Sequence, residues 1–304
     1  MSHFTVAVFS KDGEKTLEQL LAPYQENNMD DCPKEYLAFN DVTEERQKEY
    51  NEECQAMVQF ADGTRCSRYS DESPSGIKLW VPDPEDKSSF ASRKFKLPEG
   101  AEEIQVLFKE VYPTFEQFMK EYHSEEPDEE TGRYGYWENP NTKWDWYQTG
   151  GRWKGLLLIK ADAEGTSGSP GLMGSRANDE NSAPEGYKWV DSAKIKDICW
   201  EKMAEIARQG REKQWEEAPK EDGFKRNFFY GIKQGETKEQ YVERFSVFET
   251  FAVITPDGEW HEKAKMGWWA CVSDEKENWN DGYYNAFIKN ADPELTIAIV
   301  DCHI

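Results

Sequence analysis

The chain begins and ends with apolar runs that predict buried strands. Residues 3–10, HFTVAVFS, are rich in β-branched and aromatic side chains, and residues 295–304, LTIAIVDCHI, have the same character. Short apolar runs bounded by turn residues are typical of strands that are buried on both faces. Because a core strand needs a hydrogen-bonding neighbour, we expect the two terminal strands to pair, or nearly pair, within one sheet.

Helical patterns recur between these strands. Five segments carry the helical period or a helix-like composition: residues 14–27, 42–60, 104–123, 197–215 and 273–291. Pro23 is expected to stop the first of them and Pro113 to break the third, while Ser273 is expected to cap the last. Further strands are predicted at three places: residues 155–163, 248–258 and 265–272.

The order of these elements predicts an α+β fold. We expect a mixed sheet that carries both terminal strands, with helical and loop-rich insertions in the middle. Residues 1–125 are predicted to form an N-terminal α+β part. Residues 126–304 are predicted to form a second part, with a tryptophan-rich motif, that shares the sheet of the first strand. The glycine- and serine-rich stretch 164–186 is expected to be a mobile loop.

Composition restricts the classes of partner. The 304 residues include 60 acidic and 37 basic ones, for a net charge of -23. This charge disfavours direct binding of nucleic acid or an anionic membrane and favours a basic partner surface. The start has no signal-peptide pattern and no apolar run approaches about 18 residues, so we expect a cytoplasmic protein with no membrane partner. The six cysteines form no CxxC pair and predict neither a disulfide framework nor a zinc ribbon.

The densest aromatic stretch is residues 143–155, KWDWYQTGGRWKG. If it is extended, Trp144 and Trp146 share one face, while Lys143 and Asp145 lie on the other. The glycine pair that follows permits a tight turn, or a close backbone approach to something planar or anionic.

Arg152 follows the glycine pair and offers a fork of donors for phosphate or carboxylate. Aromatic rings beside cations are the components of a nucleotide site. The alternative is a structural role, with Trp144 and Trp153 in the core and Arg152 paired with Asp145.

A second stretch, WHEKAKMGWWACV at residues 260–272, repeats this arrangement of cations, glycine and aromatics. Lys265 precedes Gly267 and the pair Trp268 and Trp269. Since adjacent strand residues face opposite ways, one of the two tryptophans needs a partner outside the core. We predict that this stretch faces the first, with Arg152 and Lys265 on a phosphate and one or more of three tryptophans, Trp144, Trp146 and Trp268, against a base.

Histidines at the chain ends suggest a catalytic alternative. If the terminal strands pair, His3 meets Asp301 or His303, and such a set can hold a divalent metal that activates water. The competing interpretation is that these histidines are polar caps at strand ends. Cys302 points to the opposite face from its neighbours and is expected in the core.

The sequence also resembles a known family. The opening MSHFTVAV with LLAPYQEN, the central NPNTKWDWYQTGGRWKG and the closing TPDGEWHEKAKMGWW with DCHI are similar to an uncharacterised family found in bacteriophages and prophages. The resemblance implies a phage accessory protein that acts in the host cytoplasm. It also implies a recurring set of polar and glycine positions: Lys143, Asp145, Gly150, Gly151, Arg152, Lys265, Gly267, Asp301 and His303. The family pattern often has glycine where this chain has Ala264.

Three functions follow as hypotheses. The first is a counter-defence protein that binds, rather than transforms, a nucleotide-like anion without cofactor or metal. The second is an acidic inhibitor that blocks the nucleic-acid surface of a host defence protein. The third is a metal-assisted phosphoesterase that uses His3, Asp301 and His303. A homo-oligomer is left open. The predicted ligand-binding residues are Lys143, Trp144, Asp145, Trp146, Arg152, Lys265 and Trp268.

Overall fold

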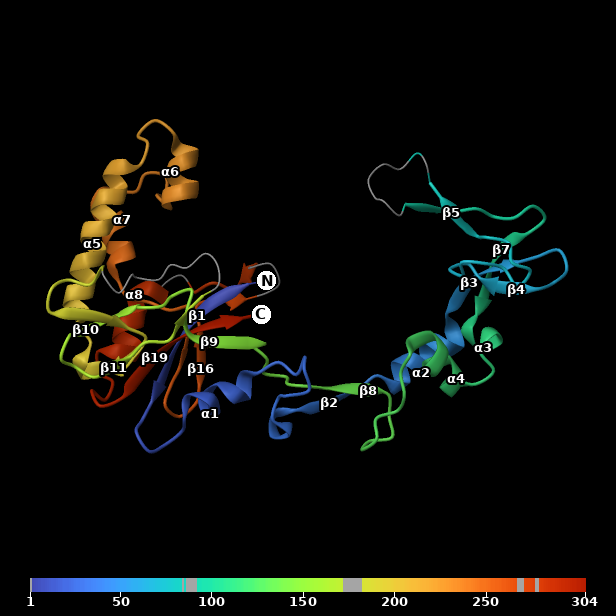
Figure 1. The fold of residues 1–304 in the computed structure, drawn as a ribbon, viewed down its shortest axis with the longest axis horizontal. Coiled ribbons are helices and arrows are strands. Elements are labelled where there is room, and N and C mark those ends of the chain that lie inside the picture. Colours follow the sequence, from blue (N-terminus) through green and yellow to red (C-terminus); the bar gives the residue numbers. More distant parts are fainter. Residues whose placement is uncertain (1, 84, 86–91, 172–181, 267–270, 277–278) are drawn as a thin grey trace. The chain divides into compact units, whose positions relative to one another are not determined.

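The chain folds into two compact units (Figure 1). The computed structural model describes residues 2–83, 85, 92–171, 182–266, 271–276 and 279–304. Unit 1 comprises residues 1–37 and 139–304, and unit 2 comprises residues 38–138. Unit 1 is therefore built from both ends of the chain, and unit 2 is inserted between residues 37 and 139. The sequence had predicted a single division, at residue 125.

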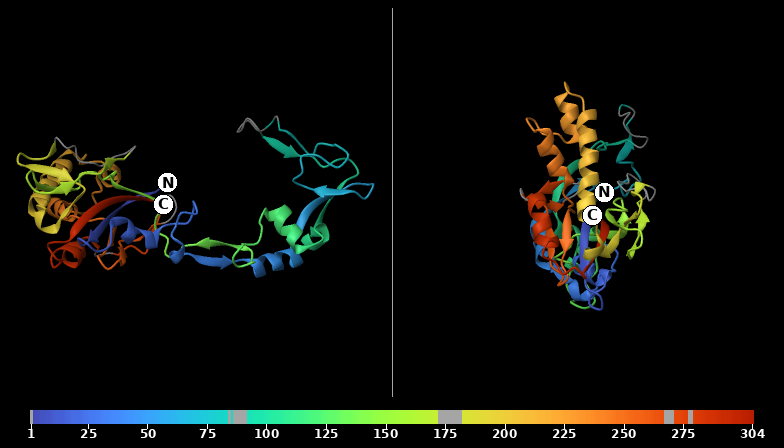
Figure 2. Two further views of the ribbon diagram at one scale, coloured as in Figure 1. Left: turned by 60° about the horizontal axis from the view of Figure 1, so that its bottom comes forward. Right: turned by 90° about the vertical axis from the view of Figure 1, so that its left-hand side faces the viewer.

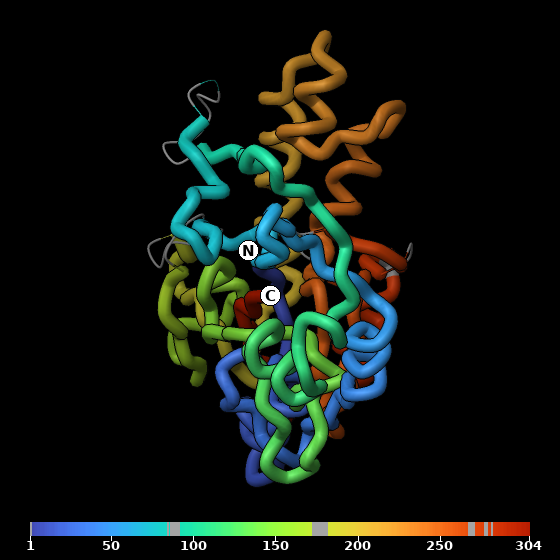
Figure 3. The backbone as a smooth tube through the Cα atoms, turned by 90° about the vertical axis from the view of Figure 1, so that its right-hand side faces the viewer, coloured from blue at the N-terminus to red at the C-terminus, as the bar shows by residue number. Residues whose placement is uncertain are grey.

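The centre of unit 1 is a mixed sheet in which the two terminal strands are neighbours. Strand β1 (His3–Ser10) pairs antiparallel with β19 (Thr296–His303) along its whole length, from His3 opposite His303 to Ser10 opposite Thr296. The two ends of the chain consequently lie side by side (Figure 3). The predicted pairing of the terminal strands and the predicted fold class are both confirmed.

The remaining strands of this sheet extend it on both sides. Beyond β1 lie β15 (Ala252–Ile254), which is parallel to β1, and then β16 (Trp260–Glu262). On its other side β19 pairs with β14 (Ser192–Lys194) over its first half and with β9 (Trp146–Gly151) over its second half. Two short strands complete the sheet: β11 (Gly165–Thr166) beside β14 and β12 (Ser169–Pro170) beside β9.

Alternate side chains of the central strands enter two hydrophobic cores. Ala7 and Phe9 face a core that also contains Trp279 and Tyr283 of α8 (Trp279–Tyr283), together with β10 (Leu157–Lys160) and β13 (Tyr187–Val190). Val6 and Val8 face the other core, under α1 (Leu17–Leu21), whose Leu20 and Leu21 are buried. This period of two explains why the apolar run is continuous, because a strand covered on both faces has no exposed side.

Three helices of unit 1 form a separate layer. They are α5 (Trp200–Glu217), α6 (Gly223–Tyr230) and α7 (Lys238–Ser246). Helix α5 extends beyond the edge of the sheet (Figure 2). A small core around Tyr241 and Ile232 holds α5 and α7 together, and Thr237 caps α7 in a reciprocal capping box with Gln240. Shorter elements of unit 1 are the strands β17 (Lys265–Met266) and β18 (Val272–Ser273) and the π-helix Tyr284–Ile288. There are also short 3₁₀ helices at Ala22–Tyr24, Lys34–Tyr36 and Ile195–Asp197.

Unit 2 has small sheets and short helices. Its strands are β2 (Ala38–Asp41) with β8 (Gly135–Glu138), the set β4 (Arg65–Ser67), β3 (Cys54–Gln59) and β7 (Glu102–Leu107), and β5 (Trp80–Pro82) with β6 (Arg93–Phe95). Its helices are α2 (Thr43–Glu52), α3 (Phe108–Val111) and α4 (Phe115–Phe118), and α4 continues into a π-helix at Met119–His123. Phe108, Phe118, Met119 and Tyr134 form a buried cluster in it.

Three predicted helices differ from the observed ones. The segment 42–60 is helix only to Glu52 and then becomes β3, and the segment 104–123 starts as the end of β7. The chain does break at Pro113, between α3 and α4. Ser273 lies in β18 and does not cap α8. Of the loop 164–186, residues 172–181 lie outside the described residues, and its first part contains β11 and β12.

Candidate functional site

Two histidine–aspartate pairs meet at the end of the terminal strands. His3 Nδ1 lies 2.8 Å from Asp301 Oδ1, and His303 Nδ1 lies 2.6 Å from Asp145 Oδ1. The two imidazole rings are edge to face with centroids 5.0 Å apart, because His3 and His303 are register partners. The structure thus brings together the three predicted catalytic candidates and adds Asp145.

The buried carboxylate of Asp301 lies at the centre of this cluster. It is 1% exposed and also accepts a hydrogen bond from the backbone N–H of Arg152, at 2.8 Å. Gly151 adopts φ +57°, and a Cβ on it would lie 2.4 Å from Asp301. The close approach predicted for this glycine is therefore made to a carboxylate of the protein itself.

Gly150 makes the same approach to a second buried carboxylate. It adopts φ +81°, and its Cβ would lie 2.8 Å from Asp191 Oδ2. Asp191 is fully buried and accepts the N–H groups of Gly155 and Gly168. Backbone donors compensate both carboxylates, as buried anions require. The turn after β9 thus packs against two buried carboxylates of the protein itself.

The tryptophans of this stretch lie on different sides of the sheet. Trp144 is buried beside Tyr147, and its indole N–H donates to the carbonyl of Leu21 at 3.1 Å. Trp146 is 48% exposed and its ring lies 6.4 Å from that of His3. The expectation that both indoles share a face is wrong, because β9 begins only at Trp146 and the period of two does not extend back to Trp144. The suggested pair of Arg152 with Asp145 is replaced by the pair of Asp145 with His303.

Two predicted cations line one small pocket. Lys143 and Lys265 border a cavity of about 180 Å³ next to Trp260, so the two motif stretches do meet there. Both charges are compensated: Lys143 contacts both oxygens of Glu262, at 2.9 and 3.1 Å, and Lys265 lies 2.7 Å from Asp274. Arg152 does not border this cavity. Trp268 lies outside the described residues, as do Gly267 and Trp269.

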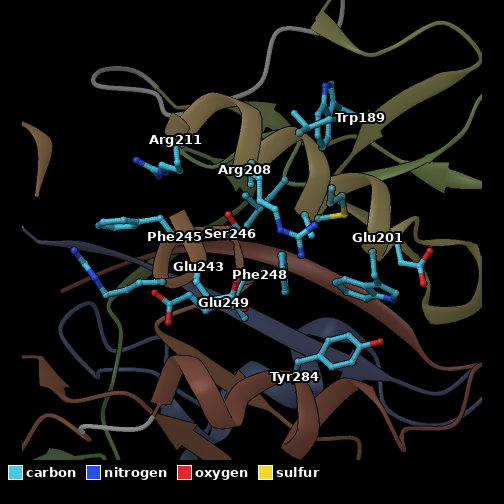
Figure 4. Close-up of a pocket in the computed structure, with 18 residues that line it drawn as sticks. Trp189, Glu201, Arg208, Arg211, Glu243, Phe245, Ser246, Phe248, Glu249 and Tyr284 are labelled. Atoms are coloured by element: carbon cyan, nitrogen blue, oxygen red, sulfur yellow. The ribbon is translucent and has the colours of Figure 1, made fainter. Parts of the chain in front are cut away.

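A much larger pocket lies between α5 and α7, where the sequence predicted no site. Its volume is about 940 Å³, and Figure 4 shows the side chains around it. Tyr284 stands at one end, and the centroid of its ring lies 6.3 Å from that of Trp200. Phe245 stands at the other end, with the guanidinium of Arg211 over its ring at 4.5 Å. Aromatic side chains form much of the wall: Trp189, Trp200, Phe245, Phe248 and Tyr284.

The charges around this pocket are mixed. Arg208 reaches from α5 into its middle, and the described residues contribute no ion pair or hydrogen bond to its guanidinium. Arg244, by contrast, is bound to Glu236 at 2.8 Å. Burial raises the pKa of the Glu249 carboxyl above its usual range, although Lys263 at 3.5 Å acts in the opposite direction. Glu201 and Glu243 also border the pocket.

Sequence reasoning missed this pocket because its residues look like ordinary helix positions. Arg208 follows Trp200 by eight residues and Arg211 follows Arg208 by three, and these helical spacings place all three on one side of α5. The same spacing is typical of any helix that packs on a core. Only the position of α7 and Phe248 opposite α5 leaves a cavity there.

Cys302 is a core residue, as expected. It is fully buried, and burial raises the pKa of its thiol well above the ordinary range, assisted by the nearby carboxylates of Asp301 and Asp145. A nucleophilic thiol requires the opposite shift. Within the described part of the chain, no group of three or more His, Cys, Asp or Glu side chains is placed to hold a metal ion.

Comparisons with known proteins return no match to a family model, to a curated protein or to a solved structure. The resemblance to a phage family stays a prediction. In the described residues, no helix is long and apolar enough to cross a membrane.

Proposed function

We propose that this chain is a binding protein for a small aromatic anion of the nucleotide class, held in the pocket between α5 and α7. The observation that carries the proposal is Arg208, a guanidinium with no described ion-pair partner inside an aromatic pocket of about 940 Å³. Pockets of 300–1,000 Å³ are typical of small-molecule sites. In a chain of net charge -23, Arg208 and Arg211 supply two guanidinium groups to this pocket, beside its glutamates.

The lining supports a ligand with two chemically different ends. A guanidinium offers paired donors to phosphate oxygens, and faces such as Trp200 and Tyr284 can stack on a base. The glutamates in the same pocket accept hydrogen bonds. A base that carries an amino group supplies the matching donors, so a nucleotide of adenine, guanine or cytosine satisfies both kinds of group.

We place the proposed site away from the residues that the sequence suggested, because four of those residues are already engaged. Trp144, Asp145, Lys143 and Lys265 all have partners within the protein. In the counter-defence role that we propose for a phage accessory protein, binding in this pocket sequesters the ligand in the host cytoplasm and leaves it chemically unchanged.

Titration with mono- and cyclic nucleotides tests the proposal. Tryptophan fluorescence is the signal, since Trp189 and Trp200 line the pocket. Arg208→Ala is expected to weaken binding about 10- to 100-fold, the usual loss for a charged hydrogen bond. Lys213→Ala is the matched control, because Lys213 lies on the same helix but outside the pocket and is 78% exposed. Binding should also weaken with added salt.

Two results would contradict the proposal. One is the absence of any fluorescence change up to millimolar nucleotide. The other is equal binding by the Arg208 and Lys213 variants, which would place the ligand elsewhere.

The histidine–aspartate cluster favours a second candidate, acid–base hydrolysis of a phosphodiester. The buried Asp301 orients the ring of His3 through Nδ1, as a general base requires. Chromatography of the titration mixtures shows whether any nucleotide is consumed. Consumption that His3→Gln abolishes and Arg208→Ala leaves intact would support this candidate, and an unchanged nucleotide pool would refute it.

A further inference from the structure

Helix α6 exposes three phenylalanines that nothing in the described part of the chain covers. Phe224, Phe228 and Phe229 are 71%, 69% and 68% exposed. The rings of Phe224 and Phe228 are stacked 5.5 Å apart and nearly parallel, and Phe229 meets Phe228 edge to face at 5.1 Å. They form one continuous apolar patch, which we call the α6 phenylalanine patch.

The helix is attached to the rest of unit 1 by other residues. Arg226 lies over the ring of Trp215 at 4.8 Å, and Asn227 donates to the carbonyl of Ile232. Asp222 caps the start of the helix, and Gly231 ends it in the left-handed conformation. None of the three phenylalanines belongs to the small core that α5 and α7 share. The patch therefore contributes little to folding, and exposed apolar surface of this kind marks an interaction site.

Charge restricts what can cover the patch. Residues 200–246 contain ten acidic and ten basic residues, so this segment is neutral while the rest of the chain carries the whole net charge of -23. Anionic lipid is repelled by the rest of the chain. Two copies of this chain likewise repel one another over most of their surface, but not where the neutral segments meet.

The patch is also complementary to itself. In an antiparallel pair related by a twofold axis, Phe224 of each copy lies against Phe228 of the other. The same arrangement brings Glu221, before the helix, toward Lys233, after it. Both residues are exposed, and neither belongs to an ion pair among the described residues. In an isologous contact of this kind, the same patch of each copy forms both sides of the interface.

We propose that the chain forms a reversible homodimer through the α6 phenylalanine patch. A fully exposed phenylalanine has roughly 200 Å² of accessible surface area. At the observed exposures, the three rings together can therefore bury about 400 Å² per copy. Both copies together then bury about 800 Å², half of a standard interface. The dimer is accordingly weak, with a dissociation constant on the order of 10 to 100 µM. This inference is independent of the proposed ligand.

Sedimentation velocity over a range of protein concentration tests the dimer. The wild-type chain should shift from monomer to dimer across the micromolar range. Phe224→Ser with Phe228→Ser should raise the dissociation constant at least about 50-fold, since buried aromatic residues dominate interface energies. The matched control is Tyr69→Ser, an aromatic of unit 2 that is 70% exposed. Because both variants change exposed side chains, circular dichroism should show unchanged folding.

Salt and lipid separate this dimer from its alternatives. Added salt should strengthen the dimer, because it screens the repulsion between two acidic chains. A wild-type protein that stays monomeric at several hundred micromolar in high salt would overturn the proposal, as would a dimer that survives loss of both phenylalanines. Flotation with neutral phosphatidylcholine vesicles that depends on Phe224 and Phe228, without any dimer, would assign the patch to lipid instead.

Discussion

At the scale of single residues, the glycine pair shows how a suggestive motif can serve the fold. Gly150 and Gly151 both adopt positive φ and both lie against buried carboxylates, Asp191 and Asp301. The sequence left open a tight turn or a close approach to something planar or anionic, and the structure has a close approach to an anion. The sequence could not show that the anion is internal, because Asp191 and Asp301 are 40 or more positions away in the chain.

Replacing Gly151 with alanine tests this role. The substitution combines an unfavourable φ with a contact of 2.4 Å to a buried side chain, so we expect a loss of about 2–4 kcal/mol in the free energy of unfolding. Urea unfolding measures the change.

Gly210 provides the control, because it lies inside α5 with nothing within 4 Å of its Cβ position. Gly210→Ala should stabilise the protein by about 0.5–1 kcal/mol. Equal effects of the two substitutions would show that Asp301 and the turn adjust freely around residue 151.

Ionisation of Glu249 makes the free energy of unfolding depend on pH. Burial raises the pKa of its carboxyl in the folded state, so the folded protein binds this proton more tightly than the unfolded chain does. This contribution to stability is present below the unfolded pKa, near 4.3 in peptides, and is lost as the pH rises through the folded value.

Glu249→Gln removes that titration. The variant should melt near the wild-type temperature in mild acid and above it at neutral pH, where the wild-type carboxyl must ionise in the interior. Thermal unfolding at several pH values measures the difference. A melting-temperature difference that is constant with pH, or that falls toward neutral pH, would contradict a raised pKa for Glu249. It would show instead that Lys263 fully compensates the ionised carboxylate.

At the scale of elements, the terminal strands were predictable and the insert was not. Residues 3–10 and 295–304 are apolar at nearly every position, and only a doubly covered strand explains such runs. The segment 42–60 carries no comparable signal. Its second half becomes β3 because β7, more than forty residues later, supplies the hydrogen-bonding partner.

The helical layer illustrates the same limit. Helix α5 was predicted close to its observed bounds, from its charged and apolar composition. Its function as a pocket wall depends on α7, on Phe248 just after it, and on Tyr284, which come from two other places in the chain. No local pattern specifies that α5 and α7 leave a cavity at this end and close around Tyr241 at the other.

At the scale of the whole molecule, the chain leaves unit 1 and returns to it at one place. Unit 2 begins at Ala38 and ends at Glu138, and these two residues are register partners of β2 and β8. Partners in an antiparallel pair have Cα atoms about 4.5–5.5 Å apart. Among the described residues, those that form the two cores of the central sheet all belong to unit 1.

Deleting unit 2 should therefore leave unit 1 folded. We expect a chain with residues 38–138 replaced by a short Gly-Ser linker to unfold cooperatively, with a melting temperature within a few degrees of that of the first wild-type transition. Nucleotide binding should persist, since the whole pocket belongs to unit 1. Loss of the cooperative transition in circular dichroism would show that unit 1 depends on the insert.

The sequence by itself determined the parts of this protein that rest on local pattern. These are the buried terminal strands, the mixed α+β class, the break at Pro113 and the placement of Cys302 in the core, because side-chain period and backbone restrictions act over a few residues. Apart from the contact of His3 with Asp301, which the paired terminal strands predicted, the tertiary structure alone decided which groups meet. It joined Asp301 to Gly151, Asp145 to His303 and Glu262 to Lys143, and it left Arg208 in an open pocket. Burial and charge compensation depend on neighbours in space, and a chain of 304 residues can arrange those neighbours in many ways that a sequence pattern does not distinguish.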